Sequence, residues 1–145
     1  LAAELKGYIA QINKRKEKGF VFTIGDSADI REGSIAETIE RVVGDKLSPE
    51  TTRTDIINAV NEKFHVFHIV VDGCRLSVPG LEGHIITISQ SEINVIPEII
   101  ISTIQLQKGI AMDKIIEQWD EINRPTIQKA VGQLNLSDNK QEINL

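Results

Sequence analysis

The sequence is short of several residue types, and each shortage excludes a class of protein. Its one cysteine, Cys74, cannot form an internal disulfide, and a chain without disulfides suits a reducing compartment. No apolar run reaches the roughly 18 residues that a membrane-spanning helix needs, and the first residues lack the layout of a signal peptide. We therefore expect a cytoplasmic protein that does not contact a membrane.

Positive charge is also in short supply. The chain has 16 Lys and Arg residues against 21 Asp and Glu residues, for a net charge of −5. Binding to nucleic acid requires a basic face that neutralises phosphates, so this balance argues against nucleic acid as the main partner. The glycine-rich loops that cradle phosphates, G-x-G-x-x-G and G-x-x-x-x-G-K-[ST], are absent from the sequence as well.

Aromatic residues make up only 4% of the chain, although 41% of it is apolar. Isoleucine supplies far more of that apolar share than the aromatic residues do. A core of β-branched aliphatic side chains suits buried parallel strands and the helices that cover them. At 145 residues, the chain is long enough for one compact domain.

Apolar periodicity and capping signals predict strands that alternate with helices. The expected strands are residues 20–25, 64–71 and 85–89. The expected helices are 3–18, 34–43, one that starts at Ser48 or Thr52 and ends near Lys63, 94–108, one from Met112 through Ile122 that Pro125 breaks, and a last piece over 127–134. This order predicts an α/β fold with a doubly wound, mainly parallel sheet flanked by helices. Three strands are few for such a sheet, so we expect it to be incomplete, with an exposed loop over 74–83.

The first predicted strand ends in Gly25-Asp26-Ser27. Ligands of open α/β sheets bind at the carboxyl edge, where this strand delivers a carboxylate and a hydroxyl. Asp26, with Ser27 as a weaker candidate, is therefore a candidate ligand of a hard cation such as Mg²⁺. The alternative is a turn in which Asp26 bonds nearby backbone N–H groups, and spacing alone favours the turn.

A different chemistry makes Ser27 a nucleophile, since strand-Gly-Asp-Ser resembles the first block of GDSL-type esterases. That chemistry needs a histidine base near the end of the chain, and no histidine follows His84. Ala28 also stands where the motif has leucine. His65 and His68 form an H-x-x-H pair, but residues three apart on a strand point to opposite faces, so we expect structural histidines.

Two stretches together resemble the second half of a bacterial intracellular von Willebrand factor A-like (VWA) domain. They are Lys18–Asp26 and Glu62–Ile69, and the resemblance covers residues 1–109. It implies a Rossmann-like doubly wound sheet in which the strands at 20–25, 64–71 and 85–89 are the fourth to sixth. It also implies a metal ion-dependent adhesion site that holds Mg²⁺, with Asp26 as one of its ligands.

The sequence departs from that family at the ion site. Asp-x-Ser-x-Ser does not occur in the chain, and the family's Thr-Asp-Gly is replaced here by Gly25-Asp26-Ser27. We therefore expect an incomplete or degenerate ion site. Because the chain starts at Leu1 and not at Met, we also expect a C-terminal piece of a longer domain.

The resemblance implies a non-enzymatic protein–protein interaction module. Its partner is expected to be a protein, either the N-terminal half of the same domain or a second copy that pairs along the edge of the strand at 20–25. The alternatives are a small serine or metal-dependent hydrolase and a purely structural scaffold. The expected organisation is a VWA-like half over 1–109, a helical extension over 110–135 and a flexible tail over 136–145.

Overall fold

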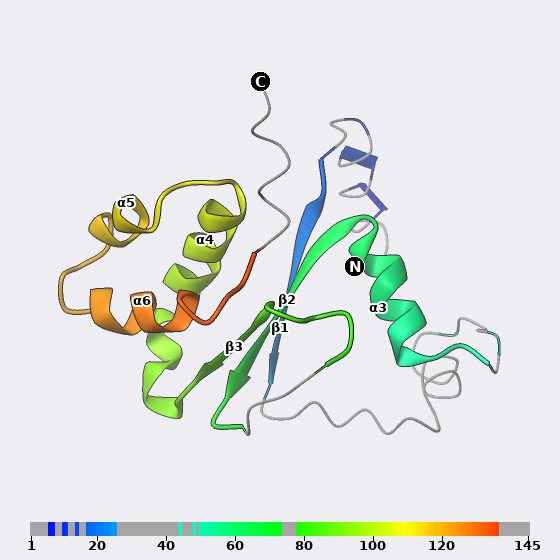
Figure 1. Ribbon diagram of the computed structural model, residues 1–145, viewed down its shortest axis with the longest axis horizontal. Coiled ribbons are helices and arrows are strands. Elements are labelled where there is room, and N and C mark those ends of the chain that lie inside the picture. The colour runs from blue at the N-terminus through cyan, green and yellow to red at the C-terminus, as the bar shows by residue number, and fades with distance from the viewer. Residues whose placement is uncertain are drawn as a thin grey trace. The chain divides into compact units, whose positions relative to one another are not determined.

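The computed structural model describes residues 6, 7, 10, 11, 14, 17–25, 44, 48, 50–73 and 78–136. Several features of the sequence analysis lie outside these residues. They are most of the helix predicted over 3–18, the helix predicted over 34–43, Cys74, and all but the first residue of the tail over 136–145. The described elements, shown in Figure 1, are β1 (Gly19–Gly25), α3 (Arg53–Asn61), β2 (Phe64–Val71), β3 (Ile85–Ile88), η1 (Gln90–Val95), α4 (Ile96–Gln107), α5 (Met112–Glu117) and α6 (Arg124–Val131). Among the described residues, no helix combines the length and hydropathy that a membrane crossing requires.

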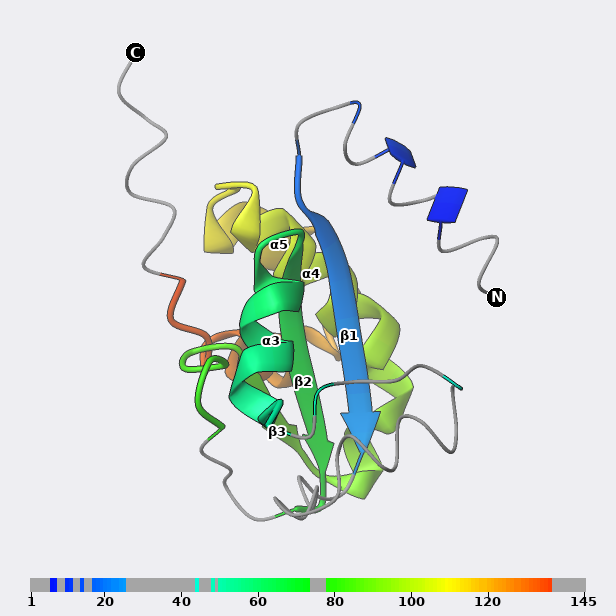
Figure 2. The same ribbon diagram turned by 90° about the vertical axis from the view of Figure 1, so that its right-hand side faces the viewer.

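The strands form one parallel sheet in the order β1-β2-β3. The arrows of β1 and β2 point the same way in Figure 2, and Figure 1 shows the arrow of β3 pointing with them. The register between β2 and β3 pairs His68 with Ile85 and Val71 with Ile88. This arrangement confirms the predicted α/β class and the parallel sheet, and the predicted strand at 64–71 has the observed bounds.

The chain divides into two compact units, and the division passes through β1 and β2. One unit consists of Leu1–Val21 and Ala28–Val66, and it contains α3 together with the starts of β1 and β2. The other consists of Phe22–Ser27 and Phe67–Leu145, and it contains the ends of β1 and β2, all of β3, and the elements from η1 to α6.

In the first unit, α3 begins where one of the two predicted starts places it. Thr52 is the N-cap: its Oγ1 accepts the N–H of Asp55 at 3.2 Å, and the Asp55 carboxylate accepts the N–H of Thr52 at 2.8 Å. The second of these bonds, and then the bond from the Thr52 hydroxyl, hold the pKa of Asp55 below its usual range. Local capping chemistry therefore fixes this end of the helix, and Ser48 is not its start.

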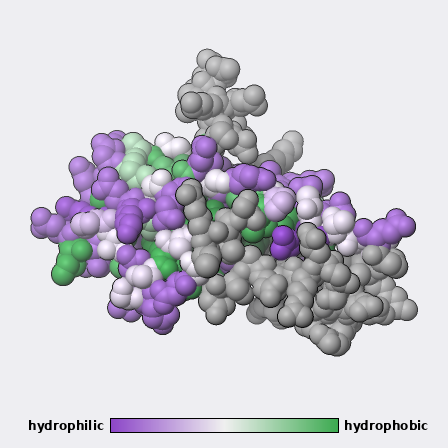
Figure 3. Space-filling view, turned by 60° about the horizontal axis from the view of Figure 1, so that its bottom comes forward, coloured by the Kyte–Doolittle hydropathy of each residue, from purple (hydrophilic) through white to green (hydrophobic). Residues whose placement is uncertain are grey.

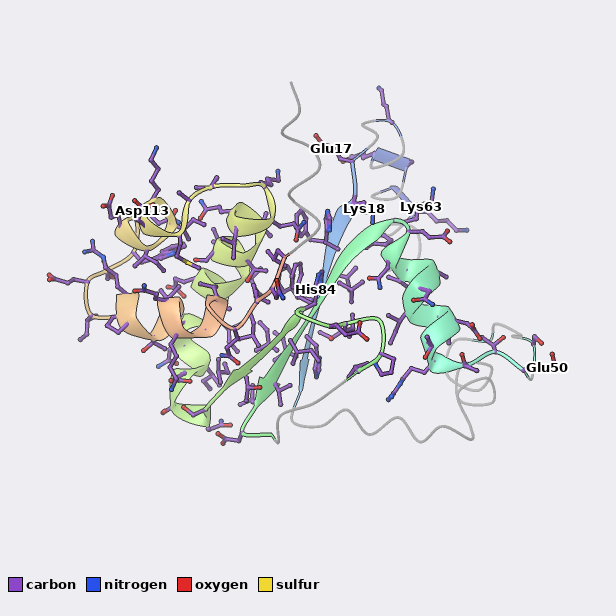
Figure 4. The ribbon with its side chains drawn as sticks, in the orientation of Figure 1. Glu17, Lys18, Glu50, Lys63, His84 and Asp113 are labelled. Carbon is purple, nitrogen blue, oxygen red and sulfur yellow. The ribbon has the colours of Figure 1, made fainter. Side chains whose placement is uncertain are left out.

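The same unit holds the start of the sheet. The N–H of Gly19 donates to the carbonyl of Lys63 at 3.1 Å, and Lys18 Nζ donates to the carbonyl of Asn61 at 2.8 Å. Figure 4 shows Lys18 and Lys63 close together at this end of β1 and β2. These two bonds fasten the start of β1 to the chain that leads from α3 into β2.

In the second unit, one face of the sheet packs against the helices α4, α5 and α6. Alternate residues of a strand share a face, so Ile69 of β2 lies on the same side as Ile86 and Ile88 of β3. The buried cluster on this side comprises Ile69, Ile86, Ile88, Val95, Ile99, Ile116, Ile127, Ala130 and Val131, and Phe22 packs against it. The isoleucine-rich composition thus supplies the contact between sheet and helices.

The second unit corrects two expectations. The helix expected from Met112 through Ile122 ends at Glu117, and Ile122 is 86% exposed. It ends there because the guanidinium of Arg124 donates to the carbonyls of Glu117 and Trp119, which otherwise lack partners at a helix end. The loop over 74–83, expected to be exposed, buries Val78 and Leu81, which are each 7% exposed.

The part of the chain predicted as one helix over 94–108 is covered by two helices, η1 and α4. The 3₁₀ helix η1 precedes α4, and its N-terminus carries a capping box between Ser89 and Glu92. Pro97 occupies the first turn of α4, as predicted, and Gly109 follows the helix with φ +87°. The helices α5 and α6 contribute to the same buried cluster as β2 and β3. The domain boundary expected at residue 109 stays a prediction.

The chain after α6 returns to the sheet at Gly83. The N–H of Asn135 donates to the carbonyl of Gly83 at 3.0 Å. Gly83 has φ +73°, and a β-carbon built there would lie 2.5 Å from the carbonyl oxygen of Asn135. Glycine is therefore required at this position both for its backbone conformation and for the close approach of another segment.

We expect Gly83→Ala to destabilise the protein more than Gly109→Ala does. Both residues have positive φ, which costs an alanine about 1–2 kcal/mol, but nothing lies within 4 Å of a β-carbon at Gly109. The difference between the two variants in urea unfolding isolates the cost of displacing Asn135. Equal losses in the two variants would contradict the close approach.

Candidate functional site

The predicted site residues follow directly after β1, which ends at Gly25. Asp26 and Ser27 lie outside the described residues, so their roles as Mg²⁺ ligands or as a nucleophile stay predictions. Their surroundings at the carboxyl edge can still be examined through the ends of β2 and β3.

At that edge, Asp72 follows β2 in a left-handed conformation with φ +53°. Its N–H donates to the carbonyl of Ile88 at 2.9 Å, and its carboxylate accepts the N–H of Gln90 at 2.7 Å. After β3, the hydroxyls of Ser89 and Ser91 lie 2.9 Å apart. The ends of β2 and β3 therefore bring oxygen atoms of Asp72, Ser89 and Ser91 to the carboxyl edge, which the sequence analysis did not single out.

These oxygen atoms bond chiefly to the turns that carry them. The carboxylate of Asp72 joins the turn after β2 to the first residue of η1, and the carboxylate of Glu92 accepts the N–H of Ser89 at 2.8 Å. Nowhere in the described parts of the chain do three His, Cys, Asp or Glu residues come together as metal ligands. The described side chains thus account for the shape of the edge and supply no complete ion site around Asp26.

The three histidines lie along the strands and make structural contacts. The ring of His84 stacks on Phe67 with centroids 4.6 Å apart, and Figure 4 shows His84 at the start of β3. The ring of His65 lies 5.1 Å from that of Phe20, whereas His68 contacts Thr23. Because Phe20 and Thr23 are on opposite faces of β1, the prediction that His65 and His68 point to opposite faces is confirmed.

A hydroxyl–imidazole pair that the sequence did not reveal joins β1 to β2. Thr23 Oγ1 lies 2.7 Å from Nδ1 of His68 and also donates to the carbonyl of Phe67 at 3.4 Å. Which atom donates in the bond between Thr23 and His68 depends on the tautomer of the imidazole. The bond joins two neighbouring strands of the sheet in either case. No sequence signal identifies it, because the register of β1 against β2 depends on the folded sheet.

Comparison with known proteins gives no match: no family model fits the chain, and no curated protein or solved structure is significantly similar to it.

The outer edge of β3 is covered by a side chain. The N–H of Thr87 donates to Oε1 of Gln133 at 3.0 Å, and Nε2 of Gln133 donates to the carbonyl of Thr87 at 2.9 Å. A single side-chain amide therefore satisfies the two backbone groups that an added strand would use. This is one way in which proteins prevent pairing at a strand edge.

For Phe22 and Ile24 of β1, the described part of the chain shows no bond like those between Gln133 and Thr87. Gly19 points its N–H toward β2, and backbone groups alternate in direction along a parallel strand, so those of Phe22 and Ile24 point away from β2. The side chain of Ile24 is 51% exposed, and β1 contains no charged residue and no proline. The backbone groups of Phe22 and Ile24 are therefore candidates for pairing with another strand.

We expect Gln133→Ala to uncover the β3 edge. Loss of the two bonds to Thr87 lowers the free energy of unfolding by about 1 kcal/mol and speeds hydrogen exchange at the Thr87 amide. Gln128→Ala, on the exposed side of α6, is the matched control and leaves that amide unchanged. Unaltered exchange at Thr87 in the Gln133 variant would show that the edge is protected by something else.

Proposed function

We propose that this chain is a non-enzymatic protein-binding module of VWA type, and that its protein partner adds a strand along the outer edge of β1. The observation that carries the proposal is the contrast between the two edges of the sheet. Gln133 closes β3, while Phe22 and Ile24 of β1 direct backbone donors and acceptors outward. Strand addition uses such groups for affinity and the alternating side chains for specificity.

The VWA assignment rests on the two sequence stretches that carry the resemblance. Lys18–Asp26 leads through β1, and Glu62–Ile69 leads into β2, its parallel neighbour in the sheet. In a doubly wound VWA sheet these would be the fourth and fifth strands, and β1 would have a neighbour on its second side. The partner strand fills that position, whether it comes from the N-terminal half of such a domain or from another protein.

A hydrolase that uses Ser27 is the alternative interpretation, and no observation favours it. A catalytic serine needs a base within hydrogen-bond reach. The contacts of the three histidines that the structure describes include Phe20, Thr23 and Phe67, each on a strand, while Ser27 lies outside the described residues. We therefore argue for the binding module alone.

Ile24→Pro tests strand addition. The N–H of Ile24 points away from β2, so proline removes an outward donor while it leaves the β1–β2 bonds in place. A lost hydrogen bond of about 1 kcal/mol together with the steric block of the ring predicts a fall of about tenfold or more in partner binding. The measurement is quantitative affinity capture from an extract of the source cells, with the wild-type chain and the variant as baits.

Ile24→Thr is the matched control for that experiment, because it removes the apolar side chain but keeps the backbone N–H. Proteins that bind by strand addition are retained by the wild type and by Ile24→Thr and are lost with Ile24→Pro. The circular dichroism of both variants establishes that the sheet is intact. If every captured protein binds the proline variant as well as the wild type, strand addition at β1 is wrong.

The ion expected from the VWA resemblance has its own test. We propose that Asp26 is one ligand of a Mg²⁺ ion, whose other ligands lie outside the described residues or on the partner. Isothermal titration with Mg²⁺ is then expected to give heat that disappears in Asp26→Ala and persists in Asp113→Ala, an exposed carboxylate on α5. No heat from the wild-type chain would mean that this chain alone does not bind the ion.

A further inference from the structure

The turn after β2 places an aspartate directly before a glycine, at Asp72-Gly73 in the second unit. Figure 3 turns the end of the sheet where the strands finish toward the viewer, and both hydrophilic and hydrophobic side chains of described residues reach the surface there. Asp72 is exposed, so water reaches its carboxylate. An aspartate in this position can rearrange without a catalyst, because glycine has no β-carbon to shield its nitrogen from the neighbouring carboxyl group.

The rearrangement converts aspartate into isoaspartate in two steps. The backbone nitrogen of Gly73 attacks Cγ of Asp72, the new C–N bond closes a succinimide ring, and a water molecule leaves with the proton of that nitrogen. Water then breaks the bond from the ring nitrogen to the backbone carbonyl carbon of Asp72, so that the main chain runs through Cβ and Cγ. The water that is lost is regained, no other reactant is needed, and the residue keeps its negative charge.

Asp72 has a backbone conformation that its neighbours have to hold in place. Of the non-glycine residues that the structure describes, it is the one with positive φ, at +53°. Such a left-handed conformation is unfavourable for an L-residue, although aspartate adopts it more readily than most, and it persists where surrounding bonds impose it. Here the bonds are those from the N–H of Asp72 to the carbonyl of Ile88 at 2.9 Å and from the N–H of Gln90 to the carboxylate at 2.7 Å.

We propose that Asp72 is a site of isoaspartate formation, and that the hydrogen bond from Gln90 restrains the reaction in the folded chain. A hydrogen bond to a charged acceptor is stronger than one to a neutral acceptor. The bond from Gln90 therefore stabilises the carboxylate more than it stabilises the neutral succinimide, whatever the path by which the ring closes. The N–H of Gly73 has no backbone acceptor among the described residues, so its nitrogen is not restrained in the same way.

The product changes the edge at which β2 ends. Isoaspartate inserts a methylene group into the main chain before Gly73 and attaches the carboxylate directly to Cα. Its carboxylate therefore no longer has the reach that joins the turn after β2 to the first residue of η1. Neither β1 nor Asp26 takes part in the reaction, so this modification site is independent of the proposed function.

The test ages the full chain at neutral pH and follows isoaspartate at Asp72 over several weeks. Trypsin cleaves after Lys63 and Arg75 and releases residues 64–75, a peptide in which Asp72 is the one acidic residue. Endoproteinase Asp-N cuts this peptide before aspartate but not before isoaspartate, and a protein isoaspartyl methyltransferase labels the resistant form. We expect that form to accumulate in the folded wild-type chain, and to accumulate faster in the chain kept unfolded in guanidinium chloride.

Gln90→Pro isolates the hydrogen bond. Proline removes the N–H and suits this position, because Gln90 is the first residue of η1 and Ser89 before it is extended, with ψ 161°. Gln90→Ala is the matched control, since it also loses the side chain but keeps the N–H. We expect isoaspartate to form about tenfold faster or more in Gln90→Pro than in Gln90→Ala, because a hydrogen bond to a charged group is lost.

Gly73→Ala checks the chemistry, and we expect it to slow the reaction several-fold because a methyl group then shields the attacking nitrogen. The modification site is wrong if neither the folded wild type nor Gln90→Pro forms isoaspartate while the unfolded chain does. The restraint is wrong if the folded and unfolded wild type react at the same rate, a comparison that needs no variant. It is also wrong if Gln90→Pro and Gln90→Ala react equally fast when circular dichroism shows both to be folded.

Discussion

The hydrogen-bonding requirement of the strand edges is the constraint on which the rest of this structure depends. In a sheet with the order β1-β2-β3, β2 has a strand on each side, and the two outer strands each leave a row of backbone groups to be satisfied. For β3 the chain does this itself, since Gln133 bonds Thr87 and the next turn of chain bonds Gly83. That arrangement explains why residues beyond α6 belong to the fold and why Gly83 has to be glycine. For Phe22 and Ile24 of β1 the described residues show no such bonds, and this contrast supports the proposed strand addition.

The helices α4, α5 and α6 also contain polar groups that need hydrogen-bond partners. Two buried hydroxyls of α4 are satisfied there, since Ser102 accepts from Trp119 and Thr103 donates to the carbonyl of Ile99 at 2.8 Å, whereas Oε2 of Glu98 is buried without a described partner. Arg124 supplies the donors that end α5, so that the chain can turn into α6. The bonds of Ser102 and Gln105 lie on the side of α4 that faces α5.

Local signals account for the parts of the fold that could be predicted. The capping box at Thr52, the proline in the first turn of α4 and the β-branched run of β2 each act within a few residues, and each appears in the structure as expected. The predictions that proved wrong concern features that depend on residues far apart in the sequence. Arg124 shortens α5 and exposes Ile122, and burial of Val78 and Leu81 depends on packing that no local pattern encodes. The pair of Thr23 and His68 belongs to the same group, because the two residues are 45 positions apart and meet only through the register of the sheet. Asp26 was predicted as a ligand because a strand ends in a carboxylate, and it stays a prediction because it lies outside the described residues.

The proposed strand addition and the proposed ion binding are separable, and the direction of the strands shows why. If a partner strand ran antiparallel to β1, its start would lie beside the end of β1. A parallel partner strand would instead bring its own carboxyl end to the edge that Asp26 follows in the sequence. A partner that both adds a strand to β1 and supplies ligands to the proposed ion at Asp26 through the end of that strand therefore has to run parallel to β1.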